Sequence, residues 1–339
     1  AVYDRNVRYH FTKQVESPLM RALFWEREME AWGNFWGKGH STTFGEYYAD
    51  GYTKGYIANW WKDIVAGATN KTLNILEVGC GNASLLPGLL DLNIIGTYTG
   101  VDAAEVQIPE AVEKRKNELL EITLKSQTGI ESFTTTQKFD VIASVYGLEY
   151  SPLNQSLPLL KELLAPNGQL RLLMHHADSV ITAMSAKALT EFDFAHMETA
   201  IAYLTDINAE LNRLNGDLSL LTQSAKAEAA RESVNTFISS VMNKSAADRN
   251  PILVDFCQAL LTFFKKIRLS PDERNQLITS ILPDFYASKE RFTQMVDVAR
   301  NKQQIDNFKR QMSGAGFTNI IIKPLNNEGV PVAWNIHAT

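Results

Sequence analysis

The stretch ILEVGCGNASLLPGLL, residues 75–90, places one carboxylate and two glycines between two apolar runs. Glycines at the end of a buried strand, here Gly79 and Gly81, let the backbone turn sharply and let a ligand approach closely. A helix that begins directly afterwards presents free N–H groups and a positive dipole end. Ala83 replaces the third glycine of a dinucleotide fingerprint, and no Gly-Lys-Ser/Thr follows, so the turn is not a P-loop. Glu77 would repel a pyrophosphate but would attract a cationic ligand.

A second carboxylate ends the next apolar run. Residues 97–101 read as a strand, and Asp102 follows them directly. Ligands of open α/β sheets settle at the carboxyl ends of the strands, where a carboxylate after the second strand can accept both ribose hydroxyls of a nucleoside. The two carboxylates and the glycine turn therefore predict a nucleoside site.

These residues need a parallel sheet to bring them together, and the chain supplies the pattern for one. Between residues 72 and 177, the apolar runs LNILEVG, TYTGVD, FDVIASVYG and GQLRLLMHH alternate with the helix-like stretches SLLPGLL, PEAVEKRKNELLEITL and LPLLKELLAPNG. This alternation predicts an α/β protein with a doubly wound, mostly parallel sheet.

The rest of the chain divides into two helical zones and a hairpin. Residues 1–70 are rich in aromatic residues and read as an N-terminal helical lid. Residues 178–312 have apolar residues at helical spacing and almost no glycine, which predicts a large helical insertion or cap. Strand character returns at 316–338 with a turn at Asn326–Gly329, which predicts a C-terminal antiparallel hairpin. Residues 71–177 and 313–339 would then form the ligand-binding core.

Glu77, Gly79, Gly81 and Asp102, in this order and spacing, resemble the class I S-adenosylmethionine (SAM)-dependent methyltransferases, over residues 70–177 and the hairpin. SVYGLEY, residues 144–150, matches the family's fourth-strand region, and LLAPNGQL, residues 163–170, resembles the turn before its fifth strand. YGLEYS and LLMHHADS are similar to a bacterial subset with small-molecule acceptors. The resemblance implies a Rossmann-like fold, SAM as cofactor, and in-line SN2 transfer of the sulfonium methyl to a small organic acceptor.

The resemblance also implies which residues bind the cofactor: Glu77, Gly79, Cys80, Gly81, Asp102, Ala103, Gln127, Thr128, Ile130, Ser144, Val145 and Tyr48. It has one gap, because we assign no residue of KSQTGIESF to the acidic position that often contacts the adenine amine after strand three. We expect Gln127 or Thr128 to bond the adenine edge instead, and Ile130 to pack on its face. Cys80 reads as a small buried side chain and not as a nucleophile.

Catalysis is assigned to His175 and His176 first and to Tyr146 second. The two histidines end the fifth strand, at the same edge as the glycine turn. Neighbouring strand residues point to opposite faces, so only one histidine can face the pocket squarely. That histidine would be the general base for an acceptor that must lose a proton. No HxH or HxxxH pattern is present, so we expect no metal.

The aromatic, glycine-rich segment 35–56 has two readings. As a lid, its rings would attract the positive sulfonium of the cofactor, with Tyr48 in contact. As structure, the tryptophans of the N-terminal zone, at near-helical spacing, would pack a helix against the core. The helical insertion has three readings, namely added bulk, an oligomer interface or a substrate cap, and the sequence does not choose among them.

The formal net charge of −5 argues against a general binder of nucleic acids or anionic membranes. No apolar run reaches the roughly 18 residues of a membrane span. Two distant cysteines and no secretory signal lead us to expect a cytoplasmic protein. The resemblance alone implies a role in small-molecule biosynthesis, and a homodimer stays open.

Three rival functions remain at this point. A SAM-consuming cyclase or lyase would use the methionyl chain intramolecularly and release methylthioadenosine, through the same cofactor motifs. A methyltransferase of RNA or protein is disfavoured by the acidic balance and by SVYGLEYSP in place of an Asn-Pro-Pro-Tyr-type motif. A non-catalytic binding protein is disfavoured by the intact set of Glu77, Gly79, Gly81 and Asp102.

Overall fold

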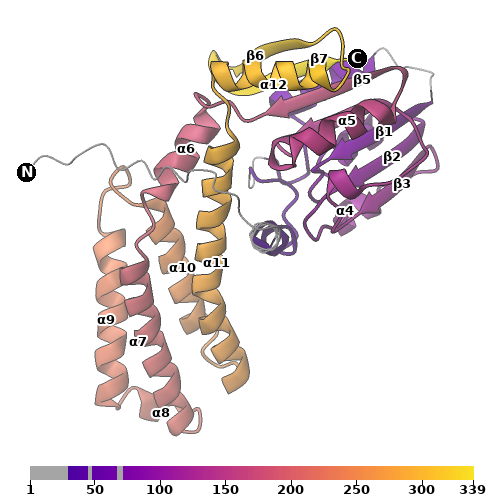
Figure 1. The fold of residues 1–339 in the computed structure, drawn as a ribbon. Coiled ribbons are helices and arrows are strands. Elements are labelled where there is room, and N and C mark those ends of the chain that lie inside the picture. The colour runs from indigo at the N-terminus through magenta and orange to yellow at the C-terminus, as the bar shows by residue number, and fades with distance from the viewer. Residues whose placement is uncertain (1–29, 45–47, 67–71) are drawn as a thin grey trace, which may run out of the picture.

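A computed structural model describes residues 30–44, 48–66 and 72–339 (Figure 1). Its centre is a seven-stranded sheet in the order β3-β2-β1-β4-β5-β7-β6. The first five strands run parallel, and β7 lies antiparallel to both β5 and β6. This architecture confirms the predicted doubly wound, Rossmann-like sheet with a C-terminal hairpin. The strands are β1 Leu73–Val78, β2 Gly96–Val101, β3 Leu120–Lys125, β4 Phe139–Val145, β5 Leu164–Met174, β6 Ile321–Asn327 and β7 Val330–Ala338.

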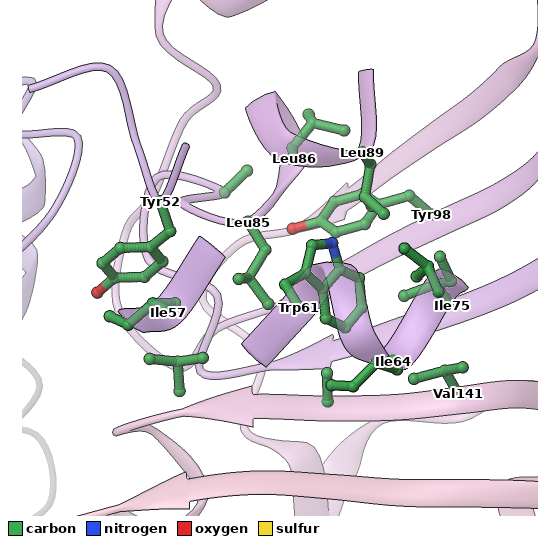
Figure 2. Packing of buried hydrophobic residues seen from close by; sticks show 14 of the residues in the cluster. Tyr52, Ile57, Trp61, Ile64, Ile75, Leu85, Leu86, Leu89, Tyr98 and Val141 are labelled. Carbon is green, nitrogen blue, oxygen red and sulfur yellow. The ribbon is translucent and has the colours of Figure 1, made fainter. Parts of the chain in front are cut away.

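The two faces of the sheet bury separate apolar clusters, because alternate residues of each strand point to opposite sides. Ile75 of β1 belongs to the cluster under α2 (Gly55–Val65) and α3 (Leu86–Asp91). Its neighbour Leu76 belongs to the cluster under α5 (Leu153–Leu163) and α12 (Lys302–Gly314). Figure 2 shows the first cluster, in which Trp61 of α2 lies among Leu85, Leu89, Tyr98 and Ile75. Helix α2 is thus a covering layer of the sheet, although it falls within the range expected for the lid.

The helical insertion follows β5 and has an apolar core of its own. Its helices are α6 Val180–Leu189, α7 Phe194–Arg213, α8 Leu218–Leu221, α9 Ala225–Met242, α10 Pro251–Lys265 and α11 Pro271–Val298. Met197, Leu204, Phe256 and Ile278 pack together inside it. Figure 1 shows the insertion as an elongated bundle beside the sheet, with the long α11 running back toward the sheet. Ser270 and Glu273 form a capping box that starts α11.

The insertion leaves and rejoins the core at one point. The backbone N–H of Arg300 donates to the carbonyl of His175, and Ala177 N–H donates to the carbonyl of Arg300, both at 3.0 Å. Directly afterwards, α12 buries Ile305, Phe308 and Met312 in the sheet's second cluster. The structure therefore ends the insertion near residue 298, earlier than the expected 312, because the apolar face of α12 covers the sheet.

Three short elements complete the core: α4 Glu110–Glu113, and the 3-10 turns η3 Ile130–Ser132 and η4 Leu148–Tyr150. No helix in residues 30–44, 48–66 and 72–339 is long and apolar enough to cross a membrane.

Candidate cofactor and acceptor pocket

A pocket lies at the carboxyl ends of β1, β2 and β4 and beside the loop that follows β3. The strand order reverses between β1 and β4, and this is where open α/β sheets form their ligand crevice. The empty space measures about 850 Å³ when its open mouth is counted. Residues of the N-terminal zone form the opposite wall.

Most of the site residues expected from the sequence line this pocket: Glu77, Gly79, Cys80, Gly81, Asp102, Ala103, Thr128, Ile130, Val145 and Tyr146. The lining does not include Tyr48, Gln127, Ser144, His175 or His176. Ser144 connects the end of β1 to the η4 turn, since its hydroxyl donates to the Val78 carbonyl at 2.6 Å and accepts from Leu148 N–H at 2.9 Å. Gln127 is exposed to solvent.

Both glycines of the turn stand where a larger residue would collide with a neighbour. Gly79 and Gly81 have φ of +65° and +51°, a conformation that L side chains rarely adopt. A Cβ on Gly79 would lie 2.6 Å from the Cα of Gly147, in the loop after β4. A Cβ on Gly81 would lie 2.5 Å from the indole ring of Trp36. The turn is therefore packed between the β4 loop and the N-terminal zone, and Gly147 is a further glycine that the sequence reading missed.

Asp102 joins the ends of two strands through its carboxylate. Its Oδ2 accepts from Gly81 N–H and its Oδ1 from Ala104 N–H, both at 2.8 Å. Burial raises the pKa of Asp102 to about 6, although these two N–H donors oppose the shift. Each carboxylate oxygen has a second lone pair, so the side chain can still accept from the hydroxyls of a ligand.

Glu77 is buried at the base of the pocket. The Tyr98 hydroxyl donates to its Oε2 at 2.5 Å. Burial raises the pKa of Glu77 to about 8, and the bond from Tyr98 opposes part of that shift. A cation bound in the pocket would favour the ionised carboxylate and lower this pKa again.

The loop after β3 supplies an acid that the sequence reading did not assign. Glu131, in η3, lines the pocket, and its Oε2 is buried with no hydrogen-bond partner among the described residues. A buried acceptor without a donor fits a ligand that brings an N–H group, such as the amine of an adenine. Thr128 and Ile130 line the same side.

Residues 30–44, called the lid segment below, lie across the glycine turn. The side-chain Nδ2 of Asn82 donates to the carbonyls of Trp36 at 2.9 Å and His40 at 2.8 Å. Ser84 Oγ donates to the Ser41 carbonyl at 2.6 Å. Trp36 is only 8% exposed and lines the pocket with Trp32. Asn82 and Ser84, which follow the glycine turn, thus hydrogen-bond the lid segment in place over the pocket. The sequence had given neither residue a role.

Tyr48 lies outside the pocket wall and is only 1% exposed. Its ring packs edge-on against Phe44 and Tyr52, with centroids 5.6 and 5.3 Å away. It belongs to the apolar cluster under α2, so its aromatic surface is used in packing.

The two histidines have different surroundings. His175 is buried, and its Nδ1 lies 2.7 Å from Glu149 Oε1, which also accepts from the His175 backbone N–H at 2.9 Å. Because a carboxylate only accepts, Nδ1 carries the proton, and Nε2 is then the basic nitrogen of the neutral ring. His176 points elsewhere, stacking on Trp334 at 4.2 Å, and burial lowers its pKa.

Two tyrosines separate His175 from the pocket. The Tyr146 and Tyr150 rings lie 4.6 and 5.9 Å from the His175 ring, and both line the pocket. Tyr146 has φ of +54°, and its hydroxyl donates to the Val332 carbonyl at 3.0 Å. A bulky residue in this conformation is strained, which is a feature of functional sites. Burial raises the pKa of Tyr146, so its phenol stays protonated at neutral pH.

Residues 76–170 match a family model described as "Methyltransferase domain". This segment is thus similar to a methyltransferase domain. The strand ends within and next to this segment carry the pocket described above. No group of three or more potential metal ligands occurs in the part of the chain that the structure describes.

Parts of the chain are also similar to solved structures of methyltransferases, at low sequence identity. A SAM-dependent methyltransferase from Clostridium acetobutylicum is 17% identical over 35% of this chain and 50% of its own, with a TM-score of 0.30. The N-methyltransferase NodS from Bradyrhizobium japonicum, in complex with S-adenosyl-L-homocysteine (SAH), is 16% identical over 43% and 74%, with a TM-score of 0.33. The 1,6-didemethyltoxoflavin-N1-methyltransferase from Burkholderia thailandensis is 14% identical over 48% and 66%, with a TM-score of 0.34.

The chain spans half the length of the first of these structures. No curated protein matches the chain.

Proposed function

We propose that this protein transfers a methyl group from SAM to a small organic acceptor. The observation that carries the proposal is one pocket that joins the glycine turn, Asp102 and the unpaired Glu131 at the ends of three neighbouring strands. When bound, SAM would supply an electrophilic methyl group on a positively charged sulfur. The chain's own residues bind and orient both reactants, and positioning of this kind lowers the barrier of a two-substrate reaction.

The pocket residues divide by the part of the cofactor that each suits. Asp102 suits the ribose hydroxyls, because each of its oxygens keeps an acceptor site. Glu131 suits the adenine amine, while Ile130 offers an apolar surface for the ring. Glu77 suits the methionyl ammonium group, whose charge would favour the ionised carboxylate.

The charge of the pocket favours an acceptor without an anionic group. Glu77, Asp102 and Glu131 line it, whereas none of the described lining residues is Lys, Arg or His. Tyr146 and Tyr150 add aromatic surface at the β4 side, next to His175. We assign the acceptor to this side, as a small, neutral or cationic molecule.

For an acceptor that must lose a proton, we keep His175 as the proposed base, and this role requires the Tyr146 or Tyr150 ring to move aside so that the acceptor reaches His175. Glu149 fixes its Nδ1–H, which leaves Nε2 to take the proton. The resemblance supports a role in small-molecule biosynthesis in the cytoplasm, and a homodimer stays a prediction.

Product analysis tests this function. Purified protein is incubated with SAM, with and without a small-molecule extract of the source cells, and the nucleoside product is identified by mass spectrometry. SAH formed only with extract supports methyl transfer, and the methylated product identifies the acceptor. Methylthioadenosine formed without extract would instead mean that the enzyme acts on the methionyl chain of SAM, and the proposal would be wrong.

A further inference from the structure

The outer side of the lid segment is bound to the helical insertion. The indole N–H of Trp32 donates to Oε1 of Gln294, in α11, at 2.7 Å. Gln294 is 8% exposed, and its Nε2 donates to Glu290 Oε1 at 3.1 Å. Because the amide donates on one side and accepts on the other, its orientation is fixed and the acceptor faces Trp32.

Two more residues of α11 hold the same segment. Arg291 donates from a guanidinium nitrogen to the Ala31 carbonyl at 3.1 Å, and its guanidinium carbon lies 4.8 Å from the centre of the Phe35 ring. Asp284 forms an exposed ion pair with Lys38 at 2.9 Å. The contacts made by Gln294 and Arg291 stabilise the lid segment more than this ion pair does, because an exposed ion pair adds little stability.

The inner side of the lid segment forms the pocket wall. Trp32 stacks on Trp36 at 6.4 Å, and Trp36 lies against Gly81 in the glycine turn. Trp32 also packs edge-on against Tyr150 at 5.7 Å. Trp32 and Trp36 thus link Gln294 of the insertion to the cofactor turn, and Trp32 and Tyr150 link it to His175.

We propose that α11 is a working part of the cofactor site, in which Gln294 and Arg291 are positioning residues that hold Trp32 and Trp36 over the bound cofactor. This rests on the proposed function, since it needs SAM or SAH in the pocket. It gives the insertion a role beyond bulk: α11 sets how long the cofactor stays bound.

The test is the dissociation rate of SAH, measured by surface plasmon resonance on the immobilised full chain. Gln294→Met keeps the size of the side chain but removes the acceptor, which leaves the half-buried indole N–H of Trp32 without this partner. We expect SAH to dissociate about 10-fold faster, the effect of losing one such hydrogen bond. Tyr286→Phe is the matched control, because it removes an exposed hydrogen bond from the same helix to Glu198, which lies in α7 and outside the lid segment.

A double-mutant cycle with Trp32→Phe separates positioning from general damage. If Gln294 acts through Trp32, then Gln294→Met changes the rate in the native background and has almost no further effect beside Trp32→Phe. Arg291→Met is a second variant if Gln294→Met does not fold, and we expect faster dissociation there too. Wild-type rates in both α11 variants would overturn the proposal while leaving the proposed function intact. No SAH binding by the wild type would overturn both.

Discussion

Replacing Gly81 with alanine tests the packing between the cofactor turn and the lid segment. The added Cβ would lie 2.5–2.9 Å from three atoms of the Trp36 ring, whereas carbon atoms pack at about 3.5–4.0 Å. The ring must therefore move by about 1 Å, in a packed site where Asn82 holds the Trp36 carbonyl. Left-handed backbone costs an alanine about 1–2 kcal/mol, and overpacking costs about 1–3 kcal/mol more.

Gly216→Ala is the matched control for the backbone term. Gly216 has φ of +80°, and a Cβ there would meet nothing within 4 Å. We expect this variant to lose only about 1–2 kcal/mol of unfolding free energy and to bind SAH as the wild type does. Urea unfolding and isothermal titration calorimetry with SAH measure the two quantities. Gly81→Ala should be less stable than Gly216→Ala and should bind SAH at least about 10-fold more weakly, a change of 1.4 kcal/mol. Equal stability and equal affinity in the two variants would refute the contact between Trp36 and the turn.

Three further predictions concern the carboxylates. Asp102→Asn turns one acceptor of a backbone N–H into a donor, so calorimetry should show SAH affinity reduced by about 10–100-fold, since hydrogen bonds to charged groups contribute about 1.5–3 kcal/mol. Glu77, with a pKa of about 8, is mostly protonated at pH 7 in the free protein. A cationic ligand lowers that pKa, so SAM binding should release protons and SAM affinity should rise between about pH 6.5 and 8. Calorimetry in buffers of different ionisation enthalpy measures the proton release. A dependence of SAM affinity on pH that persists in Glu77→Gln would contradict this prediction. Glu149→Gln should weaken the Nδ1–H preference of His175, which the ring ¹⁵N shifts of labelled protein report; unchanged shifts would mean that Glu149 does not set the tautomer.

The strands, the glycine turn and the closing hairpin follow from local sequence patterns. Ile75 and Leu76 alternate between two apolar clusters as strand periodicity requires, and Asp102 ends its strand as expected. Strand alternation also predicted that the side chains of His175 and His176 would point to opposite faces of the sheet. It did not predict that His175 would lie behind two tyrosines, because those rings come from the separate η4 turn and the end of β4.

What the sequence did not reveal depends on contacts between distant residues. Gly81 was singled out for its conformation, but the ring that excludes a side chain there belongs to Trp36, 45 positions earlier. Asn82 attracted no attention, since its partners are the lid carbonyls. Glu131 lies within the segment 125–133 in which an acid was sought, but the sequence does not show that the η3 turn places its side chain in the pocket wall.

A crystal structure of the full chain with SAH is the most direct test of the central claim. The account predicts SAH in the pocket, with its ribose at Asp102, its adenine between Ile130 and Glu131, and Trp36 across the glycine turn. SAH bound elsewhere, or a pocket that stays empty at saturating SAH, would contradict it.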